Sequence, residues 1–203
     1  MIDPGKPVRS ADQFRTPPPP ALGSEAYARD VDEVASLGTR DSEERTPDQT
    51  HIAYWWAEFC ESWCSRLARN LVEEHDLDPR RTARLFALFH VDNFDGYATN
   101  FESKYHYAFW RPVTAIRAAD DDRNDATVAN PVWQPEMRTP PFPDYPSAHA
   151  QACHGAAEIF ADAFGTADLA FTMDSRTAPE EGPATRSYES IQDAARECGL
   201  SRL

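Results

Sequence analysis

The sequence predicts an all-α protein, folded as a bundle of helices. Three observations support this fold class. Apolar residues recur at helical spacing in several segments, and residues typical of helix starts and helix ends flank those segments. No stretch repeats the strict alternation of polar and apolar residues that a half-buried strand requires. We therefore assign the elements below as helices joined by loops.

The chain opens with a segment that contains TPPPP and little apolar pattern. We interpret residues 1–23 as an extended lead-in or linker, and residues 24–203 as one partial helical domain. Ser24 is a typical N-cap for the first helix, and Gly38 is a typical residue at its end.

Thr46-Pro47-Asp48-Gln49 has the pattern of a capping box with proline at the first helical position. This pattern predicts a helix start, and residues 47–75 form either one long helix or two short ones. An aromatic group follows at helical spacing, and we interpret it as core packing. Its members are Tyr54, Trp55, Trp56, Phe59 and Trp63.

Asp78-Pro79 begins the next predicted helix, in which an apolar stripe that includes Phe86, Val91 and Phe94 faces inward and leads to Lys104. Residues 118–146 are rich in Asp, Asn and Pro, which predicts a long loop. A helix over 147–164 follows, ended by Gly165. After a polar loop through Gly182, a weak last helix spans 187–198 and stops at Gly199.

Composition restricts the function. The net charge of −14 argues against nucleic acid and anionic membrane as partners. No run of 18 apolar residues predicts a membrane span, and the N-terminus lacks a signal-peptide pattern, so we expect a cytoplasmic protein. The four cysteines are too few for a disulfide framework. We interpret Cys60 and Cys64, one helical turn apart, as buried small hydrophobic residues, and we predict no metal site made of paired Cys and His ligands.

Two motifs carry chemistry. KYHYAFWRP places Lys104 seven residues before Arg111, which returns both cations to nearly the same face of a helix, and Pro112 makes Arg111 a helix terminus. PFPDYPSAHA places Ser147 at a helix start, where free backbone N–H groups and the helix dipole favour an anion. Each residue alone is ordinary on a protein surface. Together they predict an oxyanion pocket that also contains His149.

These motifs resemble those of the superfamily of vanadium-dependent haloperoxidases and type 2 phosphatidic acid phosphatases. The fuller phrases FWRPVTAIRAAD and TPPFPDYPSAHA resemble its soluble bacterial haloperoxidase-like branch. The similarity extends from near Asp12 to Leu203, and the two motifs are specific as an ordered pair. The resemblance implies a helical bundle of the vanadium haloperoxidase and acid phosphatase type, here incomplete, because members carry further helices before and after this region.

The resemblance also assigns roles to individual residues. It implies that Lys104, Arg111, Ser147 and the backbone N–H of Ala148 bind the oxyanion of vanadate or phosphate, and that His149 is the general acid or base. Ser201-Arg202 matches the start of the third family motif, which adds Arg202 to the oxyanion site. The His that ends this motif, which ligates vanadium in the peroxidases, is absent from the sequence.

Ala148 stands where the family usually has Gly. A backbone with positive φ would make its Cβ costly, whereas a helical backbone would make alanine harmless, and the sequence leaves both alternatives open.

The resemblance implies two activities that the sequence does not separate. One is halide oxidation by peroxide with vanadate as cofactor, and the other is hydrolysis of a phosphate ester. A third alternative is a non-catalytic remnant that binds phosphate or vanadate. The expected partners are small molecules, namely halide and peroxide or a phosphate ester. An incomplete bundle also exposes apolar surface, which favours homo-oligomers.

Overall fold

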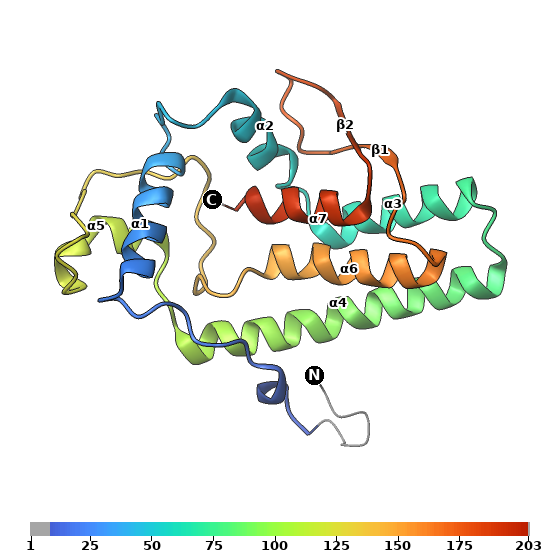
Figure 1. The fold of residues 1–203 in the computed structure, drawn as a ribbon, viewed down its shortest axis with the longest axis horizontal. Helices are drawn as coiled ribbons and strands as arrows, with labels where there is room; N and C mark the ends of the chain where they lie inside the picture. Colours follow the sequence, from blue (N-terminus) through green and yellow to red (C-terminus); the bar gives the residue numbers. More distant parts are fainter. Residues whose placement is uncertain (1–8, 203) are drawn as a thin grey trace. The chain divides into compact units, whose positions relative to one another are not determined.

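The computed structural model describes residues 9–202, and these residues confirm the all-α class (Figure 1). Seven α-helices and one two-stranded sheet form the regular structure of this part of the chain. The elements are α1 Glu25–Leu37, α2 Pro47–Trp55, α3 Cys60–Glu74, α4 Pro79–Tyr107, α5 Pro112–Arg117, α6 Ala148–Phe164, β1 Phe171–Asp174, β2 Thr185–Tyr188 and α7 Ile191–Leu200. Two short 3-10 helices, Ala11–Phe14 and Ala119–Asp121, complete them.

The chain divides into two compact units, each built from two separate segments. Unit 1 joins the chain up to Glu44 with Ala98–Pro146. Unit 2 joins Arg45–Tyr97 with the segment from Ser147 onward. The predicted lead-in over 1–23 lies partly outside the described residues, and its described part belongs to unit 1. The division into a lead-in and one domain therefore stays a prediction.

Unit 2 contains the main hydrophobic core. Helices α3, α6 and α7 pack together, and α6 and α7 lie side by side in Figure 1. The aromatic group predicted as core is largely buried, because Trp55, Trp56 and Trp63 are each at most 2% exposed. Their rings pack against one another and against Tyr188. The exception is Phe59, which is 72% exposed in the turn between α2 and α3.

Within unit 2, α4 runs antiparallel to α6. Phe89 of α4 packs on Phe160 of α6 with ring centroids 5.6 Å apart, and both side chains are fully buried. Closer to the start of α6, a Cβ built at Gly155 would lie 2.2 Å from a carboxylate oxygen of Asp92. The glycine therefore lets the carboxylate approach the helix backbone, and the two helices pack closely at this point.

Unit 1 has a smaller apolar core. Helices α1 and α5 pack together, and the buried apolar residues include Tyr27, Ile116 and Trp133. The indole N–H of Trp133 donates to the carbonyl of Ala35 (3.0 Å), which ties the long loop to α1. This hydrogen bond fixes part of the long loop of unit 1 against a helix.

The local signals for helix starts are confirmed. Ser24, Thr46 and Ser147 each accept a hydrogen bond from a backbone N–H of the following helix, and Thr46 forms the full capping box with Gln49. Asp78 accepts from two backbone N–H groups at the start of α4. The aromatic segment forms two helices, α2 and α3, and not one.

Three expectations are wrong. Val91 and Phe94 are 57% and 74% exposed, and the buried apolar side of α4 carries Leu85 and Phe89. The region after α6 contains an antiparallel hairpin that pairs Phe171 with Tyr188, where we expected loop and helix. The last helix begins only at Ile191, because Ser187 and Tyr188 belong to that hairpin, and it continues through Gly199 to Leu200 instead of stopping at the glycine.

Candidate functional site

Lys104 and Arg111 lie in unit 1, where the loop at residues 142–144 holds both cations. Nζ of Lys104 donates to the carbonyls of Pro143 (3.0 Å) and Asp144 (2.5 Å). Arg111 donates from Nε to the carbonyl of Phe142 (2.7 Å) and from Nη1 to the carboxylate of Asp144 (2.7 Å). The two cations therefore meet at one loop.

The way in which the two cations meet differs from the prediction. Helix α4 ends at Tyr107, and Ala108 has a positive φ of 47°. Arg111 has an extended backbone and is the N-cap of α5, so the two residues do not share one helix. The cause is Pro112, which disfavours helical backbone at the residue before it and is well suited to the first position of a new helix.

The surroundings of Lys104 are unusual for a lysine. The side chain is 2% exposed, and its charge is about as close to the ring of Phe142 (5.3 Å to the centroid) as that of Arg111 (4.7 Å). Burial and, to a smaller extent, the charge of Arg111 lower the pKa of Lys104, while Asp144 acts in the opposite direction, and the resulting pKa is about 8. Lys104 is thus a cation held in a site that disfavours its charge.

One nitrogen of the Arg111 guanidinium makes no hydrogen bond to the described residues. Its Nη2 is buried, and among the described residues no acceptor lies within hydrogen-bonding distance of this atom. A buried guanidinium N–H without a partner costs free energy, and an anionic oxygen would satisfy it. This is the one feature of the cation pair that itself indicates a ligand.

Ser147, Ala148 and His149 lie together in unit 2, at the start of α6. The hydroxyl of Ser147 accepts from the N–H of Ala150 (3.2 Å) and caps the helix. Ala148 is the first helical residue, and its φ is not positive, so the helical alternative holds and its Cβ causes no backbone strain. The first N–H groups of a helix lie outside its own hydrogen-bond ladder, which leaves them free for an anion.

His149 and Arg202 both contact the C-terminal end of α2. Nε2 of His149 lies 2.6 Å from the carbonyl of Trp56, and Arg202 donates to the carbonyl of Ala53 (3.4 Å). Because a carbonyl only accepts, Nε2 carries the proton, and Nδ1 is the basic nitrogen of the neutral ring. The negative end of the helix dipole attracts the guanidinium of Arg202.

The predicted residues therefore form two groups. Lys104 and Arg111 come together in unit 1, and Ser147, Ala148, His149 and Arg202 belong to unit 2, where His149 and Arg202 reach the same end of α2. The sequence connects the groups directly, since Asp144 precedes Ser147 by three residues. Sequence reasoning missed Phe142 and Asp144, although PFPDYP stands in the second motif immediately before Ser147.

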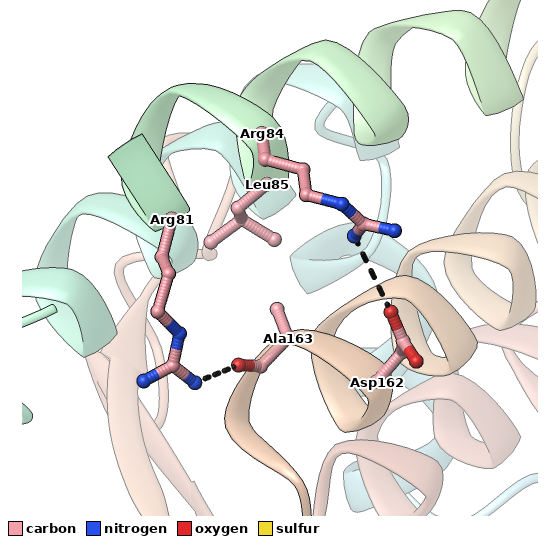
Figure 2. A pocket seen from close by; sticks show the side chains of 5 residues that line it. All are labelled: Arg81, Arg84, Leu85, Asp162 and Ala163. Carbon is pink, nitrogen blue, oxygen red and sulfur yellow. Dashed lines mark hydrogen bonds and ion pairs between the residues drawn. The ribbon is translucent and has the colours of Figure 1, made fainter. Parts of the chain in front are cut away.

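A surface pocket elsewhere in unit 2 contains none of these residues. It lies where the start of α4 meets the end of α6, as Figure 2 shows. Arg81 donates to the carbonyl of Ala163 (2.7 Å), and Arg84 lies 3.6 Å from the carboxylate of Asp162. These contacts occupy both arginines with the end of α6, so the pocket is better explained as helix packing than as an anion site.

None of the described helices has both the length and the hydrophobicity that crossing a bilayer requires.

This chain is similar to known proteins in sequence and in structure. Residues 84–203 match the family described as the VCPO second helical-bundle domain. The vanadium chloroperoxidase of Curvularia inaequalis is 32% identical over 136 residues, which covers 54% of this chain and 22% of that protein.

Solved structures give the same family. A bacterial vanadium-dependent iodoperoxidase matches 96% of this chain and 48% of its own, with a TM-score of 0.76 and 26% identity. An apo-type bacterial vanadium-dependent chloroperoxidase shares the fold, with a TM-score of 0.72, 20% identity and coverage of 96% of this chain and 47% of its own. The chain spans less than half the length of each of these relatives.

Proposed function

Because this chain belongs to the vanadium haloperoxidase family, we propose that it binds the vanadate oxyanion through Lys104 and Arg111, as the first part of a haloperoxidase-type site. The observation that carries the proposal is the buried Nη2 of Arg111, which has no acceptor among the described residues. Two cations held at one loop, one with an unused donor, suit an anion that carries several oxygens.

The donor set fits vanadate as an oxyanion. The cations of unit 1 bind negative oxygens, and in unit 2 the start of α6 offers backbone N–H groups that also favour an oxyanion. Ser147 and Ala148 supply this helix start, His149 supplies a group that can exchange a proton, and Arg202 supplies a further cation. When bound, vanadate supplies a metal centre at which peroxide is activated for the oxidation of halide.

The chain's own residues perform binding and proton transfer in this proposal. Asp144 occupies Nη1 of Arg111, so an incoming oxyanion either bonds to Nη2 or displaces this carboxylate. Lys104 contributes most to anion binding while it is charged, that is, at a pH below its lowered pKa of about 8. His149 holds a proton on Nε2 against the carbonyl of Trp56, and its Nδ1 accepts one.

Anion binding is tested by the thermal midpoint at pH 7 with and without orthovanadate. An anion at about 100 times its Kd adds about 2.7 kcal/mol to the free energy of unfolding, which raises the midpoint by several degrees. We expect this rise in the wild type and its loss in Lys104→Met and in Arg111→Met. Arg29→Ala, which removes an exposed arginine of α1 in unit 1, should keep it.

Inorganic phosphate provides the second arm of the same experiment, since it has the shape and charge of vanadate. A rise with both anions supports an oxyanion site, and the vanadate-loaded protein is then assayed for peroxide-dependent halide oxidation. Equal rises in the wild type and in Lys104→Met would contradict the proposed binding residues. Folding of each variant is checked by circular dichroism.

A further inference from the structure

Three cysteine side chains from three different helices of unit 2 meet in its core. Cys60 begins α3, Cys153 lies within α6, and Cys198 lies within α7. Sγ of Cys60 is 2.7 Å from Sγ of Cys153 and 3.6 Å from Sγ of Cys198, and all three sulfur atoms lie within 4.8 Å of one another. All four cysteines of the chain are buried and free.

The distance between the sulfur atoms of Cys60 and Cys153 indicates whether this pair suits a metal ion or a disulfide bond. A metal ion bound by two thiolates at about 2.3 Å keeps their sulfur atoms roughly 3.8 Å apart. The observed 2.7 Å is well below that separation and approaches the length of a covalent bond between sulfur atoms, which is about 2.05 Å. The pair is therefore better placed for a direct bond than for sharing a metal.

The surroundings also make Cys60 the more reactive of the two. As the first residue of α3, it lies at the positive end of the helix dipole, which stabilises a thiolate. Hydrogen bonds from the thiols of Cys153 and Cys198 lower the pKa of Cys60, whereas burial raises the pKa of Cys153. The cluster thus places a thiol whose ionisation the helix start favours in contact with a second thiol.

We propose that Cys60 and Cys153 are a redox pair that forms a disulfide on exposure to hydrogen peroxide, while Cys198 stays reduced. This inference does not depend on the proposed function, because it uses none of the residues assigned to oxyanion binding.

The reaction balances in two steps. The Cys60 thiolate attacks one oxygen of peroxide, the O–O bond breaks, and hydroxide leaves, which gives a sulfenic acid on Cys60. Cys153 then attacks this sulfur, the S–O bond breaks, and the S–S bond forms. Overall, two thiols lose two hydrogens and one peroxide becomes two waters.

Cys198 has a distinct place in this arrangement. The thiols of both Cys60 and Cys198 lie near the carbonyl of His149, at 3.4 and 3.7 Å. Sγ of Cys198 lies farther from Sγ of Cys60 (3.6 Å) than Sγ of Cys153 does (2.7 Å), so Cys153 is the nearer partner for a bond to Cys60. This predicts that Cys198 keeps its hydrogen.

The test treats the folded full-length chain with hydrogen peroxide, quenches it in acid, and counts thiols after denaturation and alkylation. We expect the count to fall from four to two. Trypsin digestion then locates the bond, because the three cysteines lie on separate peptides, 46–66, 139–176 and 197–202. The expected product joins 46–66 to 139–176.

Two variants assign the sulfur atoms. Cys64 shares the peptide 46–66 with Cys60, so Cys64→Ser is the matched control and should keep the cross-link. Cys60→Ser should abolish it, and the wild type together with Cys64→Ser decides the question even if Cys60→Ser fails to fold. Four remaining thiols in the wild type, a bond to 197–202, or loss of the cross-link in Cys64→Ser would overturn the proposal. Stoichiometric zinc that protects the thiols from peroxide would also overturn it.

Discussion

In unit 1, Lys104 and Arg111 are held by the carbonyls and one carboxylate of the loop at 142–144, whereas in unit 2 His149 belongs to a helix packed against a dense apolar core. The cations of unit 1 thus depend on polar contacts at a loop, and one of their partners, Asp144, is about one-third exposed at its side chain. The histidine belongs to α6, whose position depends on its packing against α3 and α7.

The proposed function therefore depends both on polar contacts and on a close-packed core. Polar contacts respond to pH and salt and tolerate small changes of shape. A close-packed core responds to lost volume and is indifferent to salt. Changes of each kind should therefore affect the two units differently, and the following predictions test this from the largest effect to the smallest.

The largest effect is expected from Phe160→Ala in unit 2. Phe160 of α6 is fully buried and packs on Phe89 of α4, so the change removes buried surface and leaves a cavity. We expect the free energy of unfolding to fall by about 3–5 kcal/mol, as measured by urea denaturation. Phe94→Ala is the control because Phe94 is 74% exposed, and it should change this free energy by no more than about 0.5 kcal/mol. Equal effects of the two changes would contradict the assigned core.

The second effect is a pH dependence that arises in unit 1. The pKa of Lys104 is lowered from its ordinary 10.5 to about 8, so between these values the unfolded chain binds the proton more strongly than the folded one. The free energy of unfolding therefore rises with pH across this window, by up to about 3 kcal/mol. Other groups titrate there too, so the measured quantity is the difference between the wild type and Lys104→Met. A difference that does not change from pH 7 to pH 10 would show that the lysine has an ordinary pKa.

The smallest effect is expected from Asp144→Asn. This change removes the charge that Arg111 contacts at 2.7 Å and keeps the shape of the side chain. Because the pair is partly exposed, the loss of unfolding free energy should be about 0.5 kcal/mol at low salt, and it should vanish near 1 M salt. The thermal midpoint across a salt series measures it. A loss of unfolding free energy that persists at high salt would show that Asp144 acts through packing, as residues of the unit 2 core do, and not through its charge.

The sequence predicted best what is decided within a few residues. Ser24, Thr46, Asp78 and Ser147 begin helices as predicted, because a cap bonds to backbone groups two or three positions away. The candidate site residues were named from two short motifs and from the family resemblance that these motifs carry, and their roles stay a prediction.

The sequence predicted poorly what distant segments decide. Apolar residues lie on more than one face of α4, so periodicity did not separate the buried Leu85 and Phe89 from the exposed Val91 and Phe94. The contact between Arg111 and Asp144 spans 33 positions and needs a loop conformation that no local rule specifies. The meeting of three cysteines from α3, α6 and α7 depends on helix packing for the same reason.

The interleaving of the two units also sets the order in which they are completed during synthesis. The aromatic side chains of α2 and α3 leave the ribosome before Ala98–Pro146 is made, and the helices that cover them, α6 and α7, follow only after that segment. At roughly 5–20 residues per second, the wait lasts several seconds. During that time the indoles of Trp55, Trp56 and Trp63 lack their final neighbours, so the nascent chain exposes apolar surface that the finished fold buries.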